Sequence, residues 1–351
     1  MAIHRIYPNQ DSTIWSAPDV AGVYGNAGKD EILEIAGYPD SSDDDKGRSK
    51  RILMDFNTED IRKVVDSKTG GLISCSLHLP IAEASELPFN FNIEVYPVSE
   101  SWQNGVGKIN DVPTNTSGVT WKDRDGIGTA WSADGGSYIT NTFSTSTMKV
   151  GDDSLDLAID VTEIVKAHYS GSITNYGLVL KLEDQYEDYT DASISLKYYG
   201  SDTNTIFKPY LEFKEVNDYY NPGVSELDTD NSRVYISNQK RQYVNKGSAR
   251  FRISAKPNFP TRTFSTGSIY KTNYALPAAS YYSIVDHFSN ETIVEFSPFT
   301  NINADGEGSY FDIDMEMLAP ERYYKLKVKT TLDNSTVIFS EDNLFKVVRN
   351  G

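Results

Sequence analysis

Few residues in this sequence have the types and spacing that catalysis requires. Its four histidines are His4, His78, His168 and His287, and no two of them stand at the spacing of a metal site. The sequence also contains no phosphate-cradling glycine loop and no nucleophile elbow. Because enzymes hold activated groups within reach of each other, we expect structural histidines, no catalytic residue and no organic cofactor.

Carboxylates offer a second kind of chemistry. Residues 38–50 form an acidic loop in which Asp40, Asp43, Asp44 and Asp45 could supply oxygen ligands to a calcium ion. Their spacing matches no EF-hand loop, so we favour a solvated loop, with a weak calcium site as the alternative. A second acidic run, Glu183-Asp184, Glu187-Asp188 and Asp191, would serve a glycosidase only if two carboxylates faced each other across a cleft. In so acidic a chain these pairs carry little information, and we expect no hydrolase.

Aromatic residues in loop-like surroundings are the best candidates for binding a ligand. Trp102, Trp121, Trp131 and Tyr138 could form a platform for a glycan, because a flat apolar ring matches the C–H face of a sugar. The alternative is that these rings are buried and cap the open end of a sandwich, and we favour it. The sequence leaves both interpretations open, together with a role of these aromatics in a protein interface.

The whole-chain composition excludes several classes of partner. The net charge of −17 opposes binding to nucleic-acid backbones and to anionic membrane surfaces. No apolar run reaches the length of a membrane span, and residues 1–6 lack the apolar centre of a signal peptide. The single cysteine, Cys75, permits no internal disulfide. We therefore expect synthesis in a reducing cytoplasm without export by the signal-peptide route.

The stretch from residue 155 to residue 182 contains the elements around which the rest is organised. Leu155, Leu157 and Ile159 alternate with polar or small residues, which indicates a strand. From Val161 to His168 the apolar residues recur at helical spacing, with Asp160 or Thr162 placed to cap the helix and Gly171 to end it. A turn at residues 175–177 then leads into the apolar strand 178–182. This predicts a strand, a short helix and a central strand.

Many further short strands and turns predict an all-β chain with two domains. Alternation of apolar and polar residues predicts strands in 12–16, 32–37, 51–56, 72–79, 91–98, 192–199 and 209–213, with a short capped turn at 58–61. We expect a β-sandwich over 1–216 and a linker over 217–230, where the sequence is polar and contains Pro222-Gly223. The third segment, 231–351, is predicted to form a second sandwich.

The second domain has the strand count of an immunoglobulin-like sandwich, about seven. The predicted strands are 233–236, 249–253, 292–296, 310–315, 323–329, 336–339 and 344–348. Residues 318–326 suit the turn into a late strand, where Pro320 cannot extend a ladder and a tyrosine anchors the corner. The pairs Tyr219-Tyr220, Tyr281-Tyr282 and Tyr323-Tyr324 would each turn one ring outward if they lie in strands, and exposed tyrosine suits interfaces.

The first domain resembles the DNRLRE-type module, a jelly-roll β-sandwich that is frequent in bacterial surface proteins. Ordered matches across most of residues 10–215 carry the resemblance: Arg51-Ile52-Leu53-Met54-Asp55-Phe56; Val95-Tyr96-Pro97-Val98 with Trp102; Val119-Thr120-Trp121; Trp131 with Gly135-Gly136-Ser137-Tyr138; and Asp160-Val161-Thr162 through Asn175-Tyr176-Gly177-Leu178. Gln103 and Asn104 stand where this family usually has an acidic residue. The resemblance implies a jelly roll over residues 1–216 and favours buried tryptophans.

Two other segments resemble virion structural proteins of tailed bacteriophages. They are residues 198–209, and 318–328 together with 345–348. Phage particles assemble in the host cytoplasm and leave by lysis, which fits the expected absence of an export signal and of disulfides. The resemblance implies a non-enzymatic subunit of a virion's tail, baseplate or neck. Its expected partners are other virion proteins and copies of itself in a symmetric assembly, and the alternative function is carbohydrate binding or adhesion.

Overall fold

The chain forms two compact units of antiparallel β-sheet. The computed structural model describes residues 3–18, 22–39, 49–67, 74–187, 191–215, 219–260 and 272–349. One unit is Ile6–Phe213, and the other combines Met1–Arg5 with Lys214–Gly351. The all-β prediction is confirmed: a jelly-roll-type sandwich is followed by an immunoglobulin-like sandwich.

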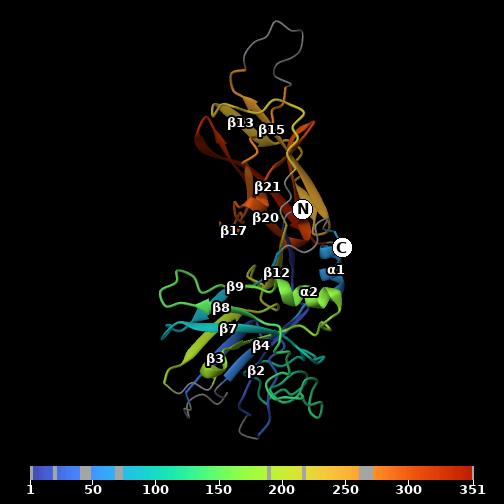
Figure 1. Ribbon diagram of the computed structural model, residues 1–351, viewed down its shortest axis with the longest axis vertical. Helices are drawn as coiled ribbons and strands as arrows, with labels where there is room; N and C mark the ends of the chain where they lie inside the picture. The colour runs from blue at the N-terminus through green and yellow to red at the C-terminus, as the bar shows by residue number, and fades with distance from the viewer. Residues whose placement is uncertain are drawn as a thin grey trace. The chain divides into compact units, whose positions relative to one another are not determined.

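The first unit contains a four-stranded and an eight-stranded sheet (Figure 1). The order in the smaller sheet is β1-β12-β5-β9, with β1 (Ile3–Ile6), β12 (Tyr210–Lys214), β5 (Ser74–Leu79) and β9 (Leu157–Asp160). The order in the larger sheet is β6-β11-β3-β4-β10-β7-β8, with β2 also paired to β4. Its strands are β2 (Gln10–Trp15), β3 (Ile32–Gly37), β4 (Ser49–Asp55), β6 (Ile81–Ala84), β7 (Phe91–Pro97), β8 (Ser144–Met148), β10 (Leu178–Leu182) and β11 (Ile194–Tyr199).

Alternating side chains of these strands build the main core of the unit. In β5 and β7 every second residue is buried, as the apolar–polar pattern requires. In β4 all side chains but the last are buried, because both faces of this strand are covered: Ile52 and Met54 enter the main core, whereas Leu53 enters a second, smaller core on the other face. The larger sheet therefore has apolar contacts on both of its sides.

The predicted strand–helix–strand unit is present with the expected boundaries. Helix α2 (Thr162–Ser170) follows β9 and ends at Gly171, whose φ of 75° is in the left-handed region. Asp160 accepts a hydrogen bond of 2.8 Å from the backbone N–H of Thr162, while the N-cap residue itself, Val161, has no capping side chain. Helix α1 (Thr58–Asp66) lies beside α2 (Figure 1), and α3 (Asp184–Glu187) follows β10.

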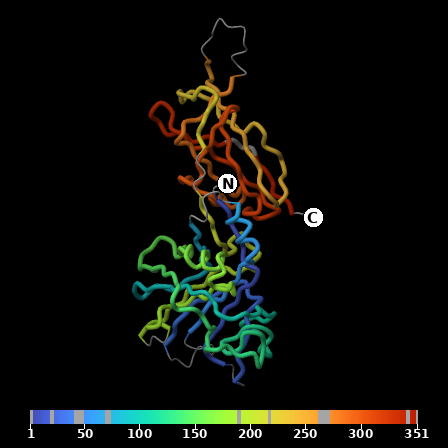
Figure 2. Tube along the Cα trace, turned by 45° about the vertical axis from the view of Figure 1, so that its right-hand side comes forward, coloured from blue at the N-terminus to red at the C-terminus, as the bar shows by residue number. Residues whose placement is uncertain are grey.

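Strands β7 and β8 are joined by a long connection over residues 98–143, which carries most of the aromatic candidates. Figure 2 shows it as a compact coil, coloured teal to green. It contains few strand pairs of its own, such as the bridges Val98↔Tyr138 and Asp123↔Ala130. Its apolar side chains pack on the outer face of the larger sheet in the second, smaller core.

The second unit has the strand order of an immunoglobulin-like domain. One sheet has the order β13-β15-β19-β18 and the other the order β14-β21-β20-β16-β17. The bounds are β13 (Ser232–Ile236), β14 (Gln242–Val244), β15 (Ser248–Pro257), β16 (Tyr281–Asp286), β17 (Thr292–Val294), β18 (Asn303–Asp305), β19 (Gly308–Asp314), β20 (Arg322–Leu332) and β21 (Ser335–Val348). Short 3-10 turns occupy Pro298–Thr300 and Met315–Met317. Strand β14 runs parallel to the end of β21, and the other pairs are antiparallel.

Three features of this unit differ from the sequence expectations. Strand β16, in the middle of a sheet, was not among the predicted strands, and the last two predicted strands form the single strand β21. Residues 219–230 are not a free linker, because Leu227 is 1% exposed and its N–H donates to the carbonyl of Ala275 at 2.8 Å. Residues 3–5 group with this unit, since Ile3 lies in its core and His4 pairs with Asp314, although β1 is also the edge strand of the smaller sheet described above.

The expected division within tyrosine pairs holds for the two pairs that lie in strands. Tyr282 and Tyr324 are 3% and 1% exposed and belong to the core of this unit. Tyr323 is 38% exposed and Tyr281 is half-buried on the opposite side of its strand. The strand pleat thus decides which ring is available to solvent.

Candidate functional site

Most of the motifs that carry the family resemblance meet around one buried arginine. Arg51, from β4, is 9% exposed, and its guanidinium lies 4.8 Å from the ring centre of Trp121 and 5.8 Å from that of Tyr138. Its Nη1 donates to the carbonyl of Gly135 at 2.7 Å. Two separate motifs are therefore held by the cation of a third, through stacking and one charge-assisted hydrogen bond.

Two buried cations share the carboxylate of Glu187 at the end of α3. Arg51 donates to both oxygens of Glu187, from Nε and Nη2, each at 2.7 Å. Lys181, on β10, has no solvent exposure, and its ammonium lies 3.2 Å from Glu187, 2.6 Å from Asp184 and 3.9 Å from Glu94. Because Glu187 is fully engaged by cations, it does not face a second carboxylate across a cleft, as a glycosidase would require.

The structure buries two of the aromatic residues proposed as a sugar platform. Trp102 and Trp131 are 3% and 5% exposed and belong to the smaller core. Their indole N–H groups donate to the backbone carbonyls of Tyr176 and Thr120, at 2.8 and 3.1 Å. Trp121 and Tyr138 are half-buried against the same core. The buried interpretation therefore fits Trp102 and Trp131, whose rings are not open to a ligand.

A fully buried asparagine that the sequence did not single out ties the long connection in place. The Nδ2 of Asn26 donates to the carbonyls of Asn104 and Val119 at 2.7 and 2.8 Å. Its Oδ1 accepts from the backbone N–H groups of Gly28 and Gly107. One side chain thus satisfies four backbone groups of segments far apart in the sequence. The sequence around Asn26 indicates a loop, but no feature of the neighbouring residues indicates hydrogen-bond partners so far along the chain.

An open hollow of this unit lies where the larger sheet branches. Strand β4 pairs with β2, β3 and β10, so the sheet divides there. A groove of about 740 Å³ opens beside the branch. Most of the residues that line it are of polar or charged types, and the lining residues are Thr13, Asp30, Glu31, Ile32, Glu34, Lys50, Ala82, Glu83, Lys108, Ile109, Asn110, Lys197 and Tyr199.

Charged side chains of alternating sign cross the floor of this groove. Glu83 pairs with Lys197 at 3.0 Å, Lys197 stands opposite Glu34 in the strand register, and Glu34 pairs with Lys50 at 2.9 Å. Burial by itself raises the pKa of Glu34, but the Lys50 ammonium and hydrogen bonds from Tyr38, Lys50 and Ser195 outweigh burial and leave this pKa below its ordinary value. The floor is therefore a set of matched charges and not an acid poised for proton transfer.

The remaining candidates for chemistry are dispersed. His4 and His168 are each 4% exposed, and the ring of His78 stacks on Tyr210 at 4.9 Å. Burial raises the pKa of the Cys75 thiol well above its ordinary value. Among the described residues, no three His, Cys, Asp or Glu side chains are placed to hold a metal ion. The calcium candidates Asp40, Asp43, Asp44 and Asp45 lie outside the described residues.

Within the described segments, no helix has the length and apolar character needed to cross a membrane.

Comparison with known proteins gave little further information. No family model matches the sequence, and no curated protein matches it.

The chain aligns weakly with solved structures of bacterial glycosidases. A Parabacteroides merdae β-glucuronidase is 13% identical (TM-score 0.17; 99% of this chain, 35% of that one), and Bacteroides uniformis β-glucuronidase 3 is 10% identical (0.19; 99% and 35%). A putative β-galactosidase from Bacteroides fragilis is 8% identical (0.18; 97% and 41%). The chain thus spans well under half of each. At these TM-scores the alignments support no inference about fold or activity.

Proposed function

We propose that this chain is a non-enzymatic structural subunit of a tailed-phage virion, in its tail, baseplate or neck. It would assemble in the host cytoplasm with other virion proteins and with copies of itself. The observation that carries the proposal is that the motif residues have a structural role. Arg51, Trp102, Trp121 and Trp131 hold a long connection on a sheet, and the rings of Trp102 and Trp131 are buried in this contact.

Exposed apolar side chains on that connection supply surface for protein contacts. Val106, Val112 and Ile127 are 64%, 95% and 74% exposed. Because their backbone is tied to the sheet by Asn26 and Arg51, they are presented on a held support, which lowers the entropy that binding would cost. A subunit that must meet fixed neighbours in a particle needs this combination of a rigid frame and outward apolar residues.

The test is to purify phage particles from lysates of the host that carries this gene and to analyse them by mass spectrometry. We expect the chain to co-purify with particles through a density gradient, in a copy number that fits the symmetry of a tail or neck. A Val112→Asp/Ile127→Asp variant should fold normally, because both side chains are exposed, and should be depleted from particles. Absence of the wild-type chain from particles would overturn the proposal.

A carbohydrate-binding role is the second candidate function. The observation that favours it is the groove beside the branch of the larger sheet, and not the tryptophan group. The groove has the volume of a small-molecule site and combines the half-buried ring of Tyr199 with carboxylates, ammonium groups and the amide of Asn110. Such groups hydrogen-bond to sugar hydroxyls while a ring covers a C–H face.

A glycan array separates the two candidates. A binding module should retain specific glycans on the array, and Tyr199→Ala should weaken this binding, whereas Tyr169→Ala, at an exposed tyrosine outside the groove, should not. A chain that binds no glycan, or that binds equally well after Tyr199→Ala, would exclude this site as a glycan groove.

A further inference from the structure

Among the described residues of the immunoglobulin-like unit, one long strand edge has no strand paired to it. Residues 335–340 of β21 pair with β20 on one side. On its other side β21 pairs with β14 only through residues 346–348, and no described residue pairs with 335–340 there. The outward N–H and C=O groups of this segment are therefore available to an added strand.

The other edges of the same unit are short, covered or charged. Strands β14 and β17 have three residues each, and Arg5 donates to the carbonyl of Ile293 in β17 at 2.7 Å. Strand β18 is covered through the bridge Tyr220↔Ala304. Strand β13 carries Arg233, whose guanidinium lies over the ring of Tyr235. Proteins protect edge strands in these ways, so the unprotected edge of β21 stands apart.

The composition of this edge favours strand pairing. Residues 335–340 read STVIFS, with no charge, no proline and no glycine in a chain of net charge −17. The side chain of Ile338 is 54% exposed. A charged partner would gain no ion pair with these six residues, whereas two copies of this acidic chain could pair through them without placing like charges directly opposite each other.

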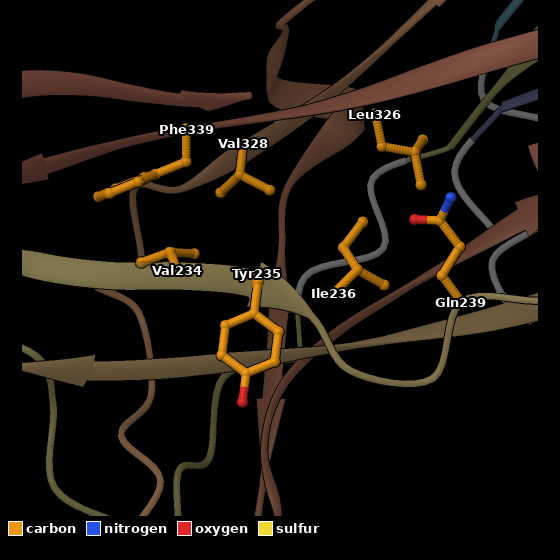
Figure 3. A pocket seen from close by; sticks show the side chains of 7 residues that line it. All are labelled: Val234, Tyr235, Ile236, Gln239, Leu326, Val328 and Phe339. Carbon is orange, nitrogen blue, oxygen red and sulfur yellow. The ribbon is translucent and has the colours of Figure 1, made fainter. Parts of the chain in front are cut away.

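An apolar gap lies directly beneath the edge, between the two sheets of the sandwich. Figure 3 shows Val234 of β13 facing Val328 and Phe339, and Ile236 pointing toward Leu326, while Tyr235 points to the other side of β13. The gap has a volume of about 20 Å³, and Phe339 is only half-buried. A strand added at this edge would cover Phe339 with an inward-facing side chain.

We propose that this edge pairs with the same edge of a second copy of the chain, across a two-fold axis normal to the sheet. Such an axis joins the two edge strands in antiparallel orientation and leaves the inner faces of both copies on the same side of the joined sheet. Odd-numbered residues therefore pair with odd-numbered residues, and even-numbered with even-numbered ones. With the axis at Ile338, each Ile338 stands opposite its counterpart, and Val337 of one copy stands opposite Phe339 of the other. The inference deepens the proposed assembly role, on which it rests for its biological setting, but it is testable on the isolated protein.

Charge variants at the axis test whether the two copies of Ile338 face each other. The wild-type chain should dimerise in analytical ultracentrifugation. Ile338→Lys and Ile338→Glu should each weaken the dimer by more than about tenfold, because like charges then face each other in an antiparallel pair. An equimolar mixture of the two variants should recover it as a heterodimer. Thr331→Lys and Thr331→Glu, at an exposed position of the inner strand β20, are the matched controls and should leave the dimer unchanged.

Thermal unfolding checks that the Ile338 variants are folded, as the exposure of this side chain predicts. A monomeric wild-type chain at high concentration, or a dimer insensitive to both Ile338 variants, would overturn the inference. Failure of the mixture to recover the dimer would exclude the two-fold register at Ile338. None of these results decides whether the wild-type chain is present in phage particles, so failure of the dimer and failure of the proposed function are distinguishable.

Discussion

The hydroxyl of Tyr324 donates a hydrogen bond of 2.8 Å to the backbone carbonyl of Ala319, five residues earlier in the chain. The ring is 1% exposed and packs against Phe345 in the core. This contact has the geometry of the tyrosine corner of immunoglobulin-like domains. The sequence of residues 318–326 predicted a tyrosine at this corner, in a chain whose single cysteine permits no internal disulfide. The bond fixes the path of the chain from one sheet to the other, which lets a cysteine-poor sandwich close.

Replacing this tyrosine tests the corner. Tyr324→Phe should lower the free energy of unfolding of the second unit by about 1–3 kcal/mol, because a buried carbonyl loses its donor. Tyr323→Phe, at the exposed neighbour, is the control and should change it by under about 0.5 kcal/mol. Calorimetry is the suitable measurement, since all four tryptophans lie in the first unit and their fluorescence should not move. Equal effects of the two substitutions would contradict the assignment.

The buried arginine of the first unit should be more costly to remove. Arg51→Met leaves Glu187 with only Lys181 in a buried site, and we expect a loss of about 3–5 kcal/mol in the free energy of unfolding. Urea unfolding followed by tryptophan fluorescence measures it directly. Lys63→Met breaks an exposed pair with Asp60 and should cost less than about 1 kcal/mol. A loss for Arg51→Met as small as that of the control would show that the network adds little stability.

Two glycines with left-handed backbone separate crowding from backbone strain. Gly177 has a φ of 92°, and a Cβ there would lie 2.4 Å from the carbonyl oxygen of Met54. Gly151 has a φ of 86° with nothing within 4 Å of a Cβ. We expect Gly177→Ala to cost about 3 kcal/mol or more and Gly151→Ala about 1–2 kcal/mol, measured by urea unfolding. Similar costs would mean that the strand next to Gly177 yields to the added methyl group.

Acid should destabilise the first unit through His168. Burial lowers the pKa of His168 to about 4, below its ordinary value of 6.5. The unfolded chain then binds the proton more readily, so this stability is present above pH 6.5 and is lost as pH falls from 6.5 to 4. Between pH 7 and pH 5 the loss is about 2 kcal/mol from this group. His168→Gln should remove that part of the pH dependence in urea titrations at the two pH values, and an unchanged slope would refute the assignment.

Elements with local signals were predictable from the sequence. The period change at residues 155–182 located β9, α2 and β10, because an alternating strand, a helical face and a left-handed glycine are each written in neighbouring residues. Strand β16 was missed although it is central. It contains two adjacent tyrosines followed by polar and apolar residues without clear alternation, and Ser283 and Asp286 in it are buried. Its strand state depends on pairing with β17 and β20 and not on its own pattern.

The aromatic residues of the candidate site could be predicted from the sequence, but the contacts that they make could not. The sequence singled out Trp102, Trp121, Trp131 and Tyr138 as one group, and the structure brings them to one face of the larger sheet. It did not indicate that Arg51 stacks on two of them or that Glu187, separated from Arg51 by 136 positions, closes the network. Side-chain pairs at such separation leave no periodic signal, because either partner alone resembles an ordinary surface charge.

The sequence by itself determined the all-β class, the local helices and turns, and the acidic charge that sets which partners are unfavourable. These follow from the periodicity, from the glycine and proline positions, and from the composition. Only the tertiary structure decided that Trp102 and Trp131 are buried, that a groove lined mostly by polar residues opens at the branch of the sheet, and that residues 335–340 lie at a sheet edge where no described strand pairs with their outer side. Burial and edge position depend on which strands lie side by side, and strand order is a property of long-range contacts that no local pattern contains.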